Sequence, residues 1–307
     1  MGLMSSGVNS SIFHHYFITR PPPSCRSHHI ISFTCQFYDV FHSPSFVHLV
    51  MEYGGLCLYA IIDDNAGLNL TASQKVVLHL VLALEHCLDR GVVHRDLKPE
   101  NILVRTRNHV VQSVKLCDFG LCAIAPVSRA FKCLVLCNDE EDLVLHERDW
   151  IVSDFAGSPG FVAPEIVTED KYDGRFVDLF SLGCVLLNLV LGNDMFEKIW
   201  MYPFQLEMLA EKARFSLALQ YAIEQMRQVP LFSTTTSSEG SDGNEEESFQ
   251  QRTFTDVGDL MFGLLEVDPK RRILIGIARH HRWLAFVPAG EDEKTEQLTQ
   301  IAVRIVA

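Results

Sequence analysis

Three short polar motifs constrain this chain more than any other feature of its sequence. The first is an unbroken run of eight residues at 94–101, HRDLKPEN. The second is DFG at 118–120, and the third is APE, which ends the segment GSPGFVAPE at 157–165. The apolar runs beside the first two motifs are short enough for strands: 91–93, 102–104 and 114–117. The polar residues are therefore expected on loops at strand ends, where they can gather.

These motifs, in this order, resemble the protein kinase family. A lysine two residues after the aspartate of HRD marks the Ser/Thr branch, and the forms of HRDLKPEN and GSPGFVAPE are most similar to calmodulin-dependent-like kinases. The resemblance implies an α+β, protein-kinase-like fold. This chain would hold mainly its helical C-terminal lobe, with a remnant of the β-rich N-terminal lobe. The resemblance also implies transfer of the γ-phosphate of ATP to Ser or Thr hydroxyls of a protein substrate, with ATP and Mg²⁺ as cofactors.

The residues that would carry this chemistry follow from the same motifs. Phosphoryl transfer depends on positioning and on neutralising charge on phosphate oxygens, and hard oxygen ligands hold Mg²⁺. By resemblance, Asp96 would accept or orient the proton of the attacking hydroxyl, and Lys98 would hold the γ-phosphate. Ser158 would bridge these two side chains. Asp118 would bind the magnesium ion that bridges the phosphates, and Asn101 the second ion.

A nucleotide site is implied by the segment LVMEYG at 49–54, which resembles the strand that runs into the kinase hinge. Met51 would be the gatekeeper. The backbone of Glu52 and Gly54 would meet the adenine edge, and Leu103 would lie beneath the ring. Together with Asp118 at the phosphates, these residues form the predicted nucleotide-binding set.

Two further pairings are implied by the resemblance. Asp178 would hold the backbone of the HRD loop. Arg272, in the run DPKRR at 268–272, would pair with Glu165 of APE.

The segment at 121–155 is expected to be long, mobile and to hold an activation switch. Arg95 would capture a negative group there. That group is predicted to be Asp154, with phosphorylated Ser153 as the alternative.

The N-terminal part departs from the family pattern. Before Glu52 the only glycines are Gly2 and Gly7, and no lysine precedes Lys75, so the glycine-rich loop and the strand lysine have no counterpart. A misjoined or incomplete gene model and a shortened kinase relative both explain this. The alternative function is therefore a pseudokinase or scaffold module that lacks phosphotransfer. A third interpretation is a fragment without a stable fold.

The chain divides into four expected parts. An irregular segment rich in Ser, His and Pro covers 1–27, and a partial small lobe with strands runs from 28 to the hinge at 53. The large lobe covers 54–289 and contains a disordered acidic insert at 233–249, and a helix closes the chain at 290–307. Within the large lobe the apolar spacing predicts three helices: 71–90 with Thr71 as N-cap, 177–191, and 256–265.

Composition excludes several classes of partner. Lys and Arg number 26 against 39 Asp and Glu, a formal net charge of −13, which argues against nucleic acid and anionic membranes. No apolar run reaches the ~18 residues of a membrane span, and none resembles a signal peptide, so a cytoplasmic or nuclear protein is expected. Gly2 fits only the loose pattern for N-myristoylation. Nine cysteines without a CxxC are expected to be free thiols.

Overall fold

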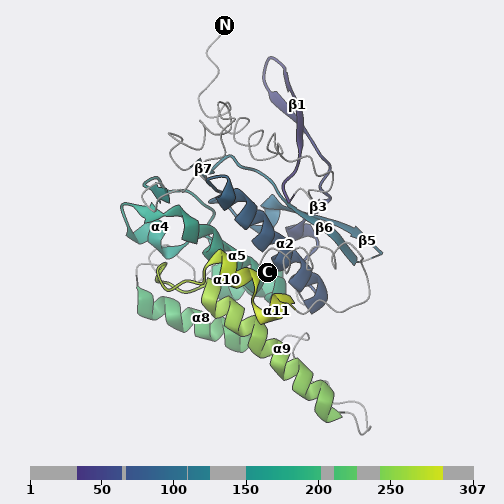
Figure 1. Cartoon of the computed structure of the whole chain (residues 1–307), viewed down its shortest axis with the longest axis vertical. Helices are drawn as coiled ribbons and strands as arrows, with labels where there is room; N and C mark the ends of the chain where they lie inside the picture. The colour runs from purple at the N-terminus through teal and green to yellow at the C-terminus, as the bar shows by residue number, and fades with distance from the viewer. Residues whose placement is uncertain are drawn as a thin grey trace, which may run out of the picture.

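The computed structural model describes residues 33–63, 67–108, 110–124, 150–201, 211–226 and 243–285. Figure 1 shows a mainly helical body, with short sheets along one side and a two-stranded hairpin that extends away from it. The expected irregular N-terminal segment, the closing helix at 290–307 and most of the expected activation segment lie outside the described residues.

Helix α5 (Gly174–Leu191) is the central element of the body. It has no polar face, and it packs against α2 (Leu70–Asp89), α9 (Gly243–Leu264) and α8 (Lys212–Met226). A helix that is apolar all round must be covered on every side. Its length and hydropathy would allow a membrane span, but 89% of it is buried inside the structure, as expected of a core helix.

Helix α2 begins one residue before the predicted start, and its cap differs from the prediction. The side chain of Asn69 accepts a hydrogen bond from the Ala72 backbone N–H at 2.9 Å, so Asn69 is the N-cap and Thr71 already lies within the helix. Asn and Thr both cap helices, and the spacing of apolar residues does not choose between them. Gly91 follows the helix with φ +71° and donates its N–H to the Leu88 carbonyl at 2.9 Å, as is usual for a glycine after a helix end.

The strands of the body are mostly short and antiparallel. β5 (Ile102–Arg107) pairs with β6 (Val110–Leu116) on one side and with β3 (Leu56–Cys57) on the other. The register places Val104 opposite Val114 in the core, and Leu103 opposite Lys115 on the other face. Four further strands form two small pairs: β4 (Val92–Val93) with β7 (Ala123–Ile124), and β8 (Ile151–Val152) with β9 (Tyr172–Asp173).

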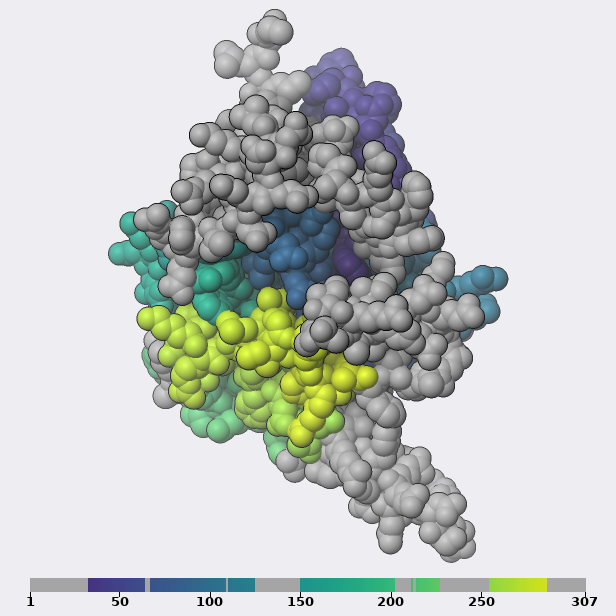
Figure 2. All heavy atoms as spheres, in the orientation of Figure 1, coloured from purple at the N-terminus to yellow at the C-terminus, as the bar shows by residue number. Residues whose placement is uncertain are grey.

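The hairpin consists of β1 (Phe37–His42) and β2 (Val47–Met51), joined by a turn after His42. The Ser43 N–H donates to the Phe46 carbonyl at 2.9 Å and closes that turn. Most of its side chains are exposed, and Figure 2 shows the hairpin as the purple projection at the upper right.

The prediction of a disordered insert at 233–249 is wrong for its last part. Helix α9 starts at Gly243, thirteen residues before the predicted helix at 256, and therefore includes 243–249. This stretch contains three consecutive glutamates at 245–247, and Glu has good helix propensity, so an acidic composition here does not prevent a helix. Short helical elements complete the described fold: η1 (Leu58–Ala60), η2 (Pro99–Asn101), α4 (Pro164–Thr168), α6 (Asn193–Phe196), η4 (Glu197–Met201), α10 (Ile275–Arg279) and α11 (Arg282–Ala285).

Candidate active site

The loop after β4 is held in place by one buried carboxylate of α5. Asp178 accepts hydrogen bonds from the backbone N–H groups of His94 and Arg95, both at 2.7 Å. Burial raises the pKa of Asp178, and His94 and the two N–H groups act against that rise. Arg95 has φ +66°, a left-handed conformation that costs a non-glycine residue free energy. Asp178 therefore fixes a strained turn directly before Asp96, which confirms its predicted role.

Four predicted site residues come together around the Asp96 carboxylate. The Ser158 hydroxyl donates to Asp96 Oδ1 at 2.7 Å, and Lys98 Nζ donates to the same hydroxyl oxygen at 2.6 Å. Lys98 Nζ also lies 3.0 Å from Asp96 Oδ2. Asn101 Nδ2 donates to Asp96 Oδ2 at 3.0 Å and to its carbonyl at 2.9 Å. Both carboxylate oxygens are thus oriented, and Asp96 is only 7% exposed.

Asp118 stands apart from this cluster on an exposed turn. Its φ is +60°, and its Oδ1 accepts the Gly120 N–H at 3.1 Å. The turn is anchored on both sides: Phe119 is buried against the His94 ring at 4.8 Å, and the Cys117 N–H donates to the Asn101 carbonyl at 3.0 Å. The second bond links the Asn101 backbone to the residue before Asp118.

The oxygen atoms of Asp118 and Asn101 fit a magnesium site by their chemistry. The Asp118 carboxylate is exposed. The Asn101 side-chain N–H donates to Asp96, which leaves the amide oxygen for a hard cation. Within the described residues there is no cluster of three or more His, Cys, Asp or Glu that could hold a metal ion. A metal at Asp118 and Asn101 would therefore need further oxygen ligands from phosphate or water.

Of the predicted nucleotide residues, Gly54 lies against Leu103, and Glu52 contacts Lys115, which is opposite Leu103 in the β5–β6 register. The Glu52 N–H donates to the Gln36 carbonyl at 2.7 Å, and its carboxylate pairs with Lys115 at 2.5 Å, so its side chain has a structural role. Gly54 is packed so closely that an added Cβ would lie 2.8 Å from Leu103 Cδ1. A side chain at position 54 would thus press directly on the predicted adenine floor.

Sequence reasoning missed two thiols beside these residues. An added Cβ on Gly54 would lie 3.0 Å from Cys35 Sγ, and Cys117 immediately precedes Asp118. Burial raises the pKa of Cys35 to about 11 and that of Cys117 to about 12. Burial therefore favours the neutral thiol at both positions over the thiolate that would be the nucleophile. Only their three-dimensional position identifies them.

A cavity of about 300 Å³ adjoins the Asp96 cluster and was also missed. Lys98 and Ser158 line one side of it, so the cavity opens beside the predicted site of transfer. Phe161 and Phe196 contribute packed rings, 5.4 Å apart, to its wall. Its lining comes from four separate segments, which explains why no local sequence pattern marked it.

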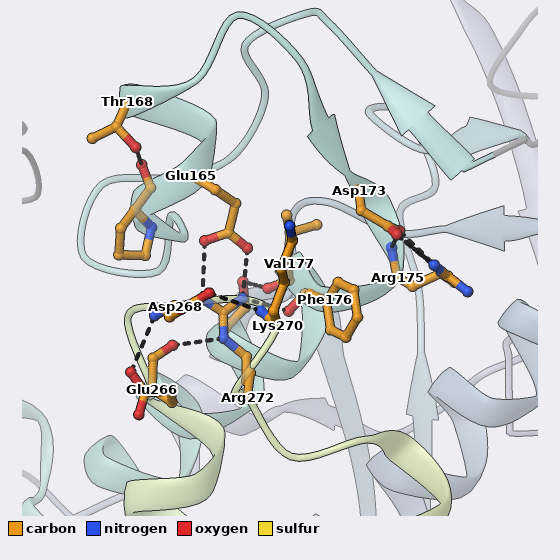
Figure 3. A network of polar contacts seen from close by, with 12 residues as sticks. Glu165, Thr168, Asp173, Arg175, Phe176, Val177, Glu266, Asp268, Lys270 and Arg272 are labelled. Carbon is orange, nitrogen blue, oxygen red and sulfur yellow. Dashed lines mark hydrogen bonds and ion pairs between the residues drawn. The ribbon is translucent and has the colours of Figure 1, made fainter. Parts of the chain in front are cut away.

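The third motif is tied to the late helices by a buried ion pair, shown in Figure 3. Arg272 donates to both oxygens of Glu165, at 2.6 and 2.9 Å, and both side chains are at most 1% exposed. Arg272 also donates to the carbonyls of Phe176 and Glu266, at 2.8 and 2.9 Å. The predicted pairing of Glu165 with Arg272 is confirmed.

Comparisons with known proteins agree with these motifs. Residues 24–284 match the protein family described as "Protein kinase domain". CBL-interacting protein kinase 9 of Oryza sativa subsp. japonica is 34% identical over 158 residues, which are 51% of this chain and 30% of that protein. CBL-interacting serine/threonine-protein kinase 26 of Arabidopsis thaliana is 33% identical over 161 residues, 52% of this chain and 32% of that protein. The matched region is about a third of the length of these relatives.

Proposed function

The chain belongs to the protein kinase family, and from this premise we propose that it transfers the γ-phosphate of ATP to Ser or Thr hydroxyls of a protein substrate. The observation that carries the proposal is the cluster in which Ser158 and Lys98 both contact the buried Asp96 carboxylate. The similarity to Ser/Thr kinases over about half of the chain supports the choice of acceptor.

The cluster suits the chemistry of an attacking hydroxyl. Asp96 is an oriented carboxylate that can accept or orient the proton of a Ser or Thr hydroxyl. The ammonium group of Lys98, 3.0 Å from that carboxylate, offsets negative charge on the transferred phosphoryl group. Magnesium, held by Asp118 and Asn101 when bound, would supply further positive charge at the phosphates.

A second candidate function is a binding module without phosphotransfer. One observation favours it. No lysine precedes Lys75, and there is no glycine between Gly7 and Gly54 to form a phosphate-binding loop. We propose on this basis that residues 1–51 supply neither a glycine-rich phosphate loop nor a strand lysine. Loss of one oriented donor costs on the order of 10²–10³ in rate. A chain without these groups would then bind magnesium-nucleotide but transfer phosphate slowly.

The test measures radiolabel transfer from ATP to a generic basic Ser/Thr substrate by the full chain. Asp96→Asn keeps the side-chain shape but removes the carboxylate, and Asp170→Asn is the matched control at an exposed aspartate. The proposal expects slow transfer that Asp96→Asn lowers by roughly 10²-fold or more and Asp170→Asn leaves unchanged.

A graft of a complete small lobe before residue 28 separates the two functions. Restored transfer that depends on Asp96 supports the kinase. A well-folded graft without transfer supports the binding module.

A further inference from the structure

Arg95 joins three segments of the candidate active site that are distant in sequence. Its guanidinium donates to the Leu121 carbonyl at 2.7 Å, to Asp154 Oδ1 at 2.6 Å and to the Tyr172 hydroxyl at 3.3 Å. The Tyr172 hydroxyl in turn donates to the Asp154 carbonyl at 2.8 Å. We call Arg95, Leu121, Asp154 and Tyr172 the Arg95 latch. The latch connects the chain after DFG, the chain before Gly157, and strand β9.

The latch lies next to the residues that would position a substrate. Asp154 precedes Ser158 by four residues, and Ser158 contacts Asp96 at 2.7 Å. Between them Gly157 has φ +126°, and an added Cβ would lie 3.1 Å from the Arg95 carbonyl. The segment 154–158 is therefore bonded to residues 95 and 96 at both ends, and Gly157 passes close to the Arg95 carbonyl between them. Release of Asp154 would free the first residue of the segment whose last residue is Ser158.

The charges of the latch explain why it holds. Arg95 is 7% exposed, so its cation has lost most of its water and needs a negative partner. Among the described residues, Asp154 is the only carboxylate in an ion pair with Arg95. The hydrogen bond from Arg95 lowers the pKa of Asp154, so this contact favours the ionised carboxylate. A charge-assisted bond of this kind is stronger than one between neutral groups.

We propose that Asp154 holds the segment 151–158 in its ordered arrangement permanently, so that this site needs no phosphate on that segment. Arginine clusters commonly order a segment by binding a phosphorylated side chain. Here the aspartate is already bound to the arginine, and its charge belongs to the sequence instead of arising from a modification. This inference rests on the proposed kinase function for its meaning, but its geometry does not depend on turnover.

Hydrogen exchange of the full chain, produced without phosphate and verified by mass, tests the proposal. Asp154→Asn removes the charge at nearly constant shape, while Asp170→Asn and Ser153→Ala are controls at exposed neighbours in the same region. We expect peptides covering 151–158 to exchange on the order of tenfold faster in Asp154→Asn, because the charge-assisted hydrogen bond from Arg95 is lost. Both controls should keep the slow exchange of the unmodified chain.

A second variant covers the case in which Asp154→Asn fails to fold. Tyr172→Phe keeps the buried ring and deletes only the hydroxyl that joins Asp154 and Arg95. Faster exchange confined to 151–158 is expected here too, by a smaller factor.

Unchanged exchange in a folded Asp154→Asn variant would overturn the proposal. So would fast exchange in the unphosphorylated chain that slows when Ser153 is phosphorylated. The expected exchange pattern together with a well-folded small-lobe graft that transfers no phosphate would reject the kinase function alone.

Discussion

The ion pair between Arg272 and Glu165 gives the sharpest prediction for stability. Arg272→Ala removes two bonds to a carboxylate that is 1% exposed, and two bonds to the carbonyls of Phe176 and Glu266. It also removes a guanidinium that lies 5.1 Å from the centre of the Phe180 ring. Breaking one side of a buried pair typically costs about 3–5 kcal/mol, because the remaining charge stays buried and unpaired.

The assay is thermal and urea unfolding followed by tryptophan fluorescence, since Trp150, Trp200 and Trp283 are all buried. For a domain of this size each kcal/mol lowers the melting midpoint by about 2–4 °C, so the expected drop is about 6–20 °C. Lys198→Ala is the control, because Lys198 and Asp194 lie 3.4 Å apart and are 65% and 49% exposed. Such a surface pair contributes at most about 1 kcal/mol.

A double variant separates the ion pair from a general loss of packing. Arg272→Met with Glu165→Leu removes both charges and keeps apolar volume, so it should destabilise less than Arg272→Ala does. A midpoint shift under about a degree for Arg272→Ala, or a double variant as unstable as the sum of both single variants, would refute the reasoning.

Three further predictions concern other parts of the structure. His79 is buried and its pKa is lowered to about 4. The unfolded chain therefore binds the extra proton between about pH 6.5 and pH 4, and stability should fall by about 2 kcal/mol from pH 7 to pH 5. His79→Leu should remove this part of the fall. An equal loss of unfolding free energy between pH 7 and pH 5 in the variant and the unmodified chain, measured by urea unfolding, would contradict it. Gly157→Ala should cost about 1–3 kcal/mol because φ is +126°, whereas Gly258→Ala, whose Cβ meets nothing within 4 Å, should stabilise helix α9; equal unfolding midpoints would count against this. Removing Mg²⁺ with EDTA should abolish nucleotide binding measured by calorimetry, because the carboxylates of Asp96 and Asp118 then repel the triphosphate; metal-independent binding would exclude the assigned ligands.

Local pattern was sufficient wherever one physical constraint dominated. The apolar run of α5 predicted a buried central helix because no polar face could reach water. Glu165 and Arg272 could be paired from the family motifs, and a buried charge also requires a partner. The Ser158 bridge between Asp96 and Lys98 was predicted in the same way.

Features that depend on tertiary placement could not be predicted. The pair of Glu52 with Lys115 joins positions 63 residues apart, and neither residue belongs to a recognisable motif for that contact. The cavity beside Lys98 is formed by separate segments, so no spacing in the sequence records it. The start of α9 at Gly243 was missed because an acidic composition suits both disorder and an exposed helix.

The geometry of the Asp96 cluster and the rate of phosphotransfer depend on different parts of the chain. Among the described residues, the hydrogen-bond partners of Asp96, Lys98 and Ser158 lie after position 93, and the loop is fixed by Asp178 of α5. The groups that would anchor the α- and β-phosphates are expected before Glu52, where the sequence has no lysine. A complete cluster can therefore exist in a chain whose transfer is slowed by misplaced phosphates, since about 1 Å of displacement can cost ~10²-fold. It follows that a low rate alone does not distinguish a kinase from a binding module. A loss of the remaining rate in Asp96→Asn distinguishes the two and supports the kinase.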